Sequence, residues 1–227
     1  MFSQVVEDYL KAVWMLQQAE SPVATSRIAE RLSLTSAAVT AMVKRLAEQG
    51  LVRHEPYYGV RLTAGGELAA LRIIRRHRVL ELFLVEKLGY DWDGVHEEAD
   101  RLEHAASDEL IERLARLLGE PDRDPHGNAI PTATGEVDME RYPALADLAP
   151  GECRRILEVE VEEPDQLRYL GSLNLRPGAE VELLGHSPFQ GPVSVAVNGA
   201  ATVISHALAQ RIRVRPAADA APETDGV

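Results

Sequence analysis

Histidine and carboxylate side chains recur at helical spacing in the segment VHEEADRLEHAAS, residues 95–107. His96, Asp100, Glu103 and His104 stand at i, i+4, i+7 and i+8, which places all four on one face of a helix. Imidazole nitrogens and carboxylate oxygens are ligands for divalent cations. The alternative is a solvated acidic helix that needs no ion. The segment alone is compatible with both interpretations.

A metal site needs ligands from more than one element, because one helix face supplies at most half of a coordination sphere. The segment HRVLE, residues 77–81, presents a second His and Glu pair at i and i+4, again on one face. The first helix can add one more carboxylate. Two sites are thus predicted, one from His77, Glu81 and His96, and another from Asp8, Asp100, Glu103 and His104.

Other roles for these side chains are open. The acids could pair with Arg78 and Arg101, and such surface ion pairs stabilise a protein by only about 0–1 kcal/mol. The stretch HEEA has no second histidine at i+4, so the HExxH motif of zinc hydrolases is absent. No nucleophile or base stands beside an open coordination position. We therefore expect no enzyme and assign no catalytic residue.

Charge is distributed unevenly along the 227 residues, a length sufficient for two or three small domains. The formal net charge of −12 excludes non-specific nucleic-acid binding by the whole surface. Residues 25–62 nevertheless carry six Lys or Arg and only three acids, a local basic patch of the kind that phosphate contact requires. The single Cys153 fits a reducing cytoplasm, and no apolar run approaches the roughly 20 residues that span a bilayer.

The order of elements in the first 63 residues is that of a winged helix-turn-helix. A helix is predicted over residues 3–19, followed by helices in TSRIAERL, with Thr25 as its cap, and in TSAAVTAMVKRLAEQG, residues 35–50. LVRHEPYYGVRLT, residues 51–63, predicts two short strands and a turn. Small and hydroxyl side chains at the start of the second short helix suit a DNA groove, and nearby basic and tyrosine side chains can reach phosphates. The predicted DNA contacts are Arg27, Thr35, Ser36, Ala37, Thr40, Lys44, Arg45, Tyr57, Tyr58 and Arg61. The alternative is a helical hairpin with a basic solvated edge.

Two long amphipathic helices are expected next, one over residues 64–87 and one that includes the acidic segment and ends near Gly119. Such helices after a winged domain commonly form a dimer interface, and dimers suit palindromic operators. Composition then shifts to Pro, Gly, Asp and Ala, as in a linker. Short β-rich runs follow from CRRILEVEV to RIRVRP and predict a small antiparallel barrel, so the fold class is α+β.

The ordered motifs EDYL, IAERL, QGLV, HR..LE, VHEEADRLEH and DPHGNAIP resemble the diphtheria toxin repressor family over nearly the whole chain, to about Arg215. The resemblance implies an iron- or manganese-dependent regulator with an SH3-like third domain. The expected domains are 1–63 (winged helix-turn-helix), 64–120 (helical dimerisation and metal binding), 121–150 (linker), 151–216 (SH3-like β domain) and 217–227 (disordered tail).

The same resemblance assigns the predicted ligands to two family sites. It implies a primary site of Asp8, Asp100, Glu103 and His104, and an ancillary site of His77, Glu81 and His96 to which Glu163 and Gln166 of EEPDQ can be added. Iron regulators of the family carry Met and Cys at the positions of Asp8 and Asp100, whereas manganese regulators carry carboxylates at both. The two-metal form of the short manganese regulators has Glu at the position of Lys11, so separate primary and ancillary sites are expected here.

The sequence thus predicts a cytoplasmic homodimer that binds double-stranded DNA at a palindromic operator and responds to a divalent metal. Carboxylate oxygens suit harder ions such as Mn²⁺, so a Mn²⁺-activated repressor of metal-uptake genes is expected, with Fe²⁺ as the alternative cofactor. The remaining alternative is a winged-helix regulator that senses a small molecule without metal.

Overall fold

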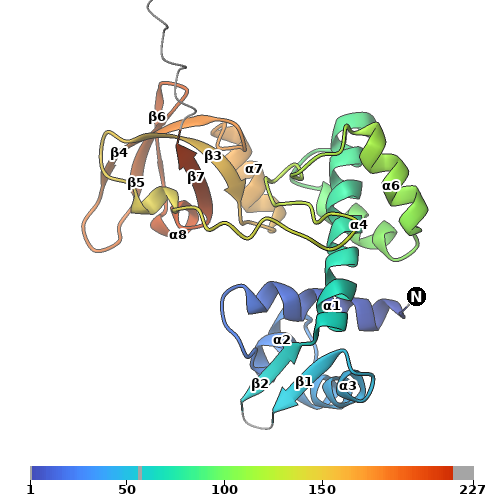
Figure 1. Ribbon diagram of the computed structural model, residues 1–227. Helices are drawn as coiled ribbons and strands as arrows, with labels where there is room; N and C mark the ends of the chain where they lie inside the picture. The colour runs from blue at the N-terminus through green and yellow to red at the C-terminus, as the bar shows by residue number, and fades with distance from the viewer. Residues whose placement is uncertain (1, 56–57, 217–227) are drawn as a thin grey trace, which may run out of the picture. The chain divides into compact units, whose positions relative to one another are not determined.

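The computed structural model describes residues 2–55 and 58–216 (Figure 1). The chain forms two compact units, one of Met1–Leu80, Ala99–Asp122 and Ile130–Asp138, and the other of Glu81–Glu98, Arg123–Ala129 and Met139–Val227. Tyr57 and the expected disordered tail at 217–227 lie outside the described residues. No helix in the described part of the chain combines the length and the apolar character that crossing a membrane requires.

The first unit begins with three helices and a hairpin, α1 (Gln4–Gln17), α2 (Thr25–Arg31), α3 (Ser36–Glu48), β1 (Val52–Glu55) and β2 (Gly59–Leu62). The strands pair antiparallel, with Arg53 opposite Arg61. Thr35 caps α3, because its hydroxyl accepts a hydrogen bond from the Ala38 amide. Thr25 does not cap α2 as expected: it is the first helical residue, and Ala24 is the N-cap. The buried core is made of Leu10, Val13, Ile28, Val39, Val43, Leu46 and Val60 with their neighbours.

The acidic helix is shorter than the sequence predicts. α4 (Ala64–Leu88) matches its expected extent, but the next segment forms two helices, α5 (Val95–Glu103) and α6 (Asp108–Leu117). Ser107 separates them, because its hydroxyl accepts from the Leu110 amide, 3.2 Å away, and so starts a new helix. The expectation of one helix to Gly119 was therefore wrong, and His104 lies in the turn that follows α5.

The second unit contains a five-stranded antiparallel sheet in the order β6-β5-β4-β3-β7. Its strands are β3 (Cys153–Val159), β4 (Glu180–His186), β5 (Val193–Val197), β6 (Ala200–Ile204) and β7 (Ile212–Pro216). The unit also contains α7 (Pro164–Ser172), α8 (His206–Ala209), the 3-10 turn η1 (Leu145–Asp147), residues 81–88 of α4 and residues 95–98 of α5. Alternate strand residues such as Val193, Val195 and Val197 enter the core, together with Leu145 of η1 and Leu167 and Leu170 of α7.

Candidate metal centre and nucleic-acid interface

Three ligand-type side chains converge in the first unit. Asp8 comes from α1, Glu103 is the last residue of α5, and His104 follows it. Nε2 of His104 lies 3.0 Å from Oδ1 of Asp8 and 3.4 Å from Oε1 of Glu103. One ligand atom from each residue lies within 4.8 Å of the other two, a spacing that could hold a metal ion. The donor set of two carboxylates and one imidazole nitrogen fits a divalent cation.

The imidazole of His104 is held by a buried carboxylate. Its Nδ1 lies 2.8 Å from Oε2 of Glu7, which is 4% exposed and also faces the guanidinium of Arg76 at 3.8 Å. An ionised carboxylate only accepts hydrogen bonds, so Nδ1 carries the proton and donates it. Nε2 faces the carboxylate of Asp8 at 3.0 Å, so it would have to be deprotonated for a metal ion to bind there. Metal-ligating histidines are commonly oriented by such a partner.

The group carries a surplus of negative charge. Burial raises the pKa of Asp8 above its ordinary value, and the neighbouring carboxylates of Glu103 and Asp100 raise it further. His104 and Lys11 act in the opposite direction but do not compensate fully. A cation bound among these oxygens would relieve that cost.

Asp100 lies beside the group but contacts different atoms. Its Oδ1 is 2.9 Å from Nζ of Lys11 and 3.2 Å from Nδ1 of His77. His77, predicted from sequence for the other site, has Nδ1 at 2.6 Å from Oε2 of Glu103. The ammonium of Lys11 lies among these side chains, at the position where the resemblance implies a Glu in the two-metal regulators. Lys11 stands three residues after Asp8, on the same face of α1.

A second group of potential ligands lies in the second unit and consists of Glu81, Asp124 and His126. All three are buried, and one ligand atom from each lies within 4.8 Å of the others. Nδ1 of His96 is 3.1 Å from Oε1 of Glu81, so this predicted pair does meet. Asp124 and His126 were not assigned as ligands from sequence, although the motif DPHGNAIP contains both.

The turn at DPHGN fixes these two side chains. Oδ1 of Asp124 accepts from the amides of His126, at 2.8 Å, and Asn128, at 3.0 Å. Gly127 has a φ of 89°, and a Cβ there would collide with the carbonyl of Leu157. Nε2 of His126 lies 2.7 Å from the carbonyl oxygen of Trp92, which can only accept. Nδ1 of His126 therefore carries the lone pair, and it faces Glu81 at 3.9 Å.

The two remaining predicted ligands lie at the start of α7. Glu163 is the N-cap residue and is exposed, with Oε2 at 3.2 Å from Nη1 of Arg211. Gln166 is half-buried on the same helix. Among the described residues neither belongs to the convergent groups of acidic and imidazole ligands above. Their role as ligands stays a prediction.

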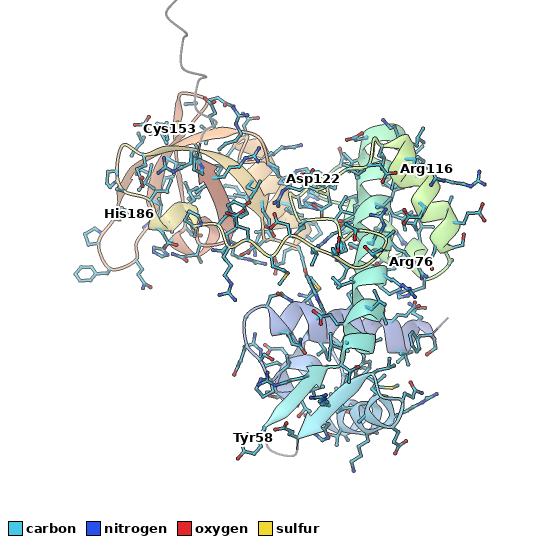
Figure 2. All side chains as sticks on the ribbon, viewed as in Figure 1. Tyr58, Arg76, Arg116, Asp122, Cys153 and His186 are labelled. Carbon is cyan, nitrogen blue, oxygen red and sulfur yellow. The ribbon has the colours of Figure 1, made fainter. Side chains whose placement is uncertain are left out.

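The predicted DNA contacts lie on exposed parts of α2, α3 and the hairpin. Thr35, Ser36 and Ala37 at the start of α3 are exposed, as are Lys44 and Arg45 toward its end. Thr40 is half-buried and donates to the Ser36 carbonyl at 2.8 Å. Figure 2 shows Tyr58 projecting from the free end of the hairpin, and its side chain is 74% exposed. The other exposed predicted contacts are Arg27 and Arg61.

Comparison with known proteins agrees with this arrangement. The N-terminal DNA-binding domain of iron-dependent repressors matches residues 1–60, their metal-binding and dimerisation domain matches residues 63–132, and the FeoA domain matches residues 144–216. The diphtheria toxin repressor of Corynebacterium efficiens is 34% identical over 218 residues, which cover 92% of this chain and 94% of the relative. The chain belongs to the diphtheria toxin repressor family. This family member is a metal-dependent, DNA-binding transcriptional repressor that dimerises, and it is not an enzyme.

Other relatives of this repressor are named for iron or for manganese. The iron-dependent repressor IdeR of Mycobacterium leprae is 30% identical and covers 92% of this chain and 95% of its own. A manganese-dependent transcriptional repressor in complex with manganese superposes with a TM-score of 0.86 at 39% identity, covering 93% of this chain and all of the other. The structure of ScaR with bound Zn²⁺ has a TM-score of 0.80 at 32% identity, covering 93% and 99%.

Proposed function

We propose that this chain is a Mn²⁺-activated repressor that binds a palindromic operator as a homodimer and controls genes of metal uptake in the cytoplasm. The observation that carries the proposal is the convergence of Asp8, Glu103 and His104 within 4.8 Å. The group contains oxygen and nitrogen donors and no sulfur. Soft thiolate and thioether ligands suit late, thiophilic metals, while carboxylates suit Mn²⁺, so manganese is favoured over iron.

The position of Asp8 explains how metal could control DNA binding. On α1, Asp8 is followed by Tyr9 and Leu10, which pack in the same core as Val39 and Val43 of the recognition helix α3. Asp8, Glu103 and His104 would hold a divalent cation, whose positive charge would neutralise these carboxylates and so stabilise α1 against the end of α5. The orientation of α1 then fixes that of α3 through their shared core. Two recognition helices so fixed in a dimer can enter successive major grooves about 34 Å apart.

A second metal site is proposed in the second unit, built from Glu81, Asp124 and His126. Its support is the burial of all three side chains and the lone pair of His126 directed at Glu81. His96, in contact with Glu81, remains a candidate member, as do Glu163 and Gln166 from the sequence prediction. We further propose that the sheet of this unit curves into an SH3-like barrel.

An electrophoretic mobility shift with the metal-free protein tests the main proposal. We expect no specific operator binding in chelator, and half-maximal binding at a lower free concentration of Mn²⁺ than of Fe²⁺. The variant Glu103→Ala should lose the response to both ions. A lower requirement for Fe²⁺ would favour the iron alternative. Equal operator affinity in chelator and in metal would refute metal control and favour a regulator that does not use metal.

A further inference from the structure

The side chain of Lys11 lies within the carboxylate cluster of the first unit. Its Nζ is 2.9 Å from Oδ1 of Asp100, 3.0 and 2.9 Å from the two carboxylate oxygens of Glu103, and 3.1 Å from Nδ1 of His77. An ammonium group has three donors and no acceptor, and the three carboxylate oxygens of Asp100 and Glu103 surround it as ligands surround a cation. Three helices, α1, α4 and α5, contribute to this arrangement.

The ammonium remains charged although it is largely buried. The Lys11 side chain is 14% exposed, and that of Glu103 is 1% exposed. Burial alone would lower the pKa of Lys11, but the Glu103 and Asp100 carboxylates outweigh it and raise the pKa above the ordinary value. The Lys11 ammonium, in contact with the carboxylates of Asp100 and Glu103, carries a positive charge at neutral pH.

Glu103 is shared between this ammonium and the candidate metal group. Both of its oxygens contact Lys11, and Oε1 also faces Nε2 of His104. A carboxylate has lone pairs enough for two partners, so the ammonium does not block a metal ion. Two cations on one buried carboxylate repel each other, however, and the interaction is strong where water is excluded.

We propose that Lys11 is a built-in competing cation that lowers the affinity of the Asp8–Glu103–His104 site for its divalent ion and so sets the metal concentration at which the repressor responds. The inference rests on the proposed function of that site. Lys11 sets the metal concentration at which the repressor responds, whereas Asp8, Glu103 and His104 bind the ion.

Calorimetric titration of the metal-free protein with Mn²⁺ tests the proposal. Lys11→Met removes the charge and keeps the apolar stem, and it should bind Mn²⁺ about ten-fold more tightly or better, since a neighbouring unit charge is removed. Lys11→Arg keeps the charge and should stay close to the wild type. Lys87→Met, at an exposed position of α4, is the matched control and should not change the affinity. Unchanged or weaker binding by folded Lys11→Met would overturn the proposal.

Lys11→Met leaves two carboxylates without their cation, so the fold of the variant must be checked by circular dichroism. A measurement on the wild-type protein avoids this difficulty. The ¹⁵Nζ resonance of Lys11 is identified by its absence in Lys11→Arg. This resonance should shift as diamagnetic Cd²⁺ is added, until the site is saturated. A resonance that stays fixed at saturation would overturn the proposal. Absence of any metal binding by the wild type would instead refute the proposed function itself, and this inference with it.

Discussion

At the scale of single residues, the tautomer of His104 decides which nitrogen can bind a metal. Glu7 favours Nε2, because its carboxylate accepts the Nδ1 proton and leaves Nε2, which faces Asp8, as the nitrogen that a metal ion could use. Glu7 is itself fixed, since it is buried and faces Arg76. In the proposed metal centre, two adjacent residues of α1 would thus have different roles: Glu7 would orient a ligand, and Asp8 would be one.

Replacing Glu7 should therefore weaken metal binding without removing a ligand. We expect Glu7→Leu to lower the Mn²⁺ affinity about 10-fold or more, the range found when a histidine loses its orienting partner. Glu7→Gln, whose amide oxygen can still accept from Nδ1, should lose less. Titration calorimetry measures both, with Glu67→Gln on the exposed surface of α4 as control. Wild-type affinity in Glu7→Leu would show that His104 needs no such partner.

At the scale of elements, a bidentate ion pair between Arg75 and Glu112 joins α4 and α6 in the first unit. Nε and Nη2 of Arg75 each donate to one oxygen of Glu112 at 2.8 Å, and Nη1 donates to the Pro131 carbonyl. The hydrogen bonds from Arg75 lower the pKa of Glu112, although partial burial opposes the shift. The folded state therefore binds the Glu112 proton less readily than the unfolded chain does.

The Arg75–Glu112 ion pair should make the free energy of unfolding depend on pH in the acidic range. Because the folded pKa of Glu112 is depressed, its contribution is present above the ordinary glutamate value of about 4.3 and is lost as pH falls through the lower folded value. Glu112→Gln should lower the free energy of unfolding by on the order of 1 kcal/mol at neutral pH. Below the ordinary glutamate pKa, the unfolding free energy of this variant should fall less steeply with pH than that of the wild type. Urea unfolding at several pH values measures this. Glu109→Gln, from the exposed pair with Arg113 on the same helix, should behave as wild type; an equal effect would contradict the assignment.

An element can be predicted from sequence when local interactions form it, and is harder to predict when a single side-chain contact decides where it ends. The helices and hairpin of the winged domain follow from periodicity and turn residues, and the predicted helices overlap α1, α2, α3 and α4. The division between α5 and α6 depends on one capping bond at Ser107, which competes with a continuous helical pattern. α7 was missed although Pro164 at its first position, after Glu163, is a helix-start signal.

The candidate sites likewise contain some residues that could be predicted from sequence and some that could not. Asp8, Glu103 and His104 were grouped from spacing and the resemblance, and the structure brings them together. Asp124 and His126 lie in a turn with no periodicity, so no spacing rule could direct them toward Glu81. The resemblance places residue 11 near the metal site, but the contacts of Lys11 with Asp100 and Glu103 depend on how α1 meets α5, a tertiary property that a linear pattern does not contain.

At the scale of the whole molecule, charge determines how the protein can meet DNA. The formal net charge is −12, yet residues 25–62 carry twice as many basic as acidic side chains. We therefore expect the phosphate contacts to come from this segment, because the rest of the chain carries a net negative charge that opposes DNA binding. A homodimer presents the segment twice, so on a palindromic operator we expect each basic contact to be made at both half-sites.

The salt dependence of operator binding measures whether each phosphate contact is made twice per dimer. Lys44 is exposed on α3 and is expected to contact a phosphate. Each phosphate contact contributes about −0.9 to the slope of log K against log salt, so Lys44→Ala should reduce the magnitude of the slope by about 2 per dimer. Affinity should fall equally for operator variants, because the contact carries no base information. Fluorescence anisotropy in saturating Mn²⁺ gives the slopes, and Lys87→Ala is the control. A change of about 1 would mean that only one recognition helix engages DNA, and an unchanged slope would remove Lys44 from the interface.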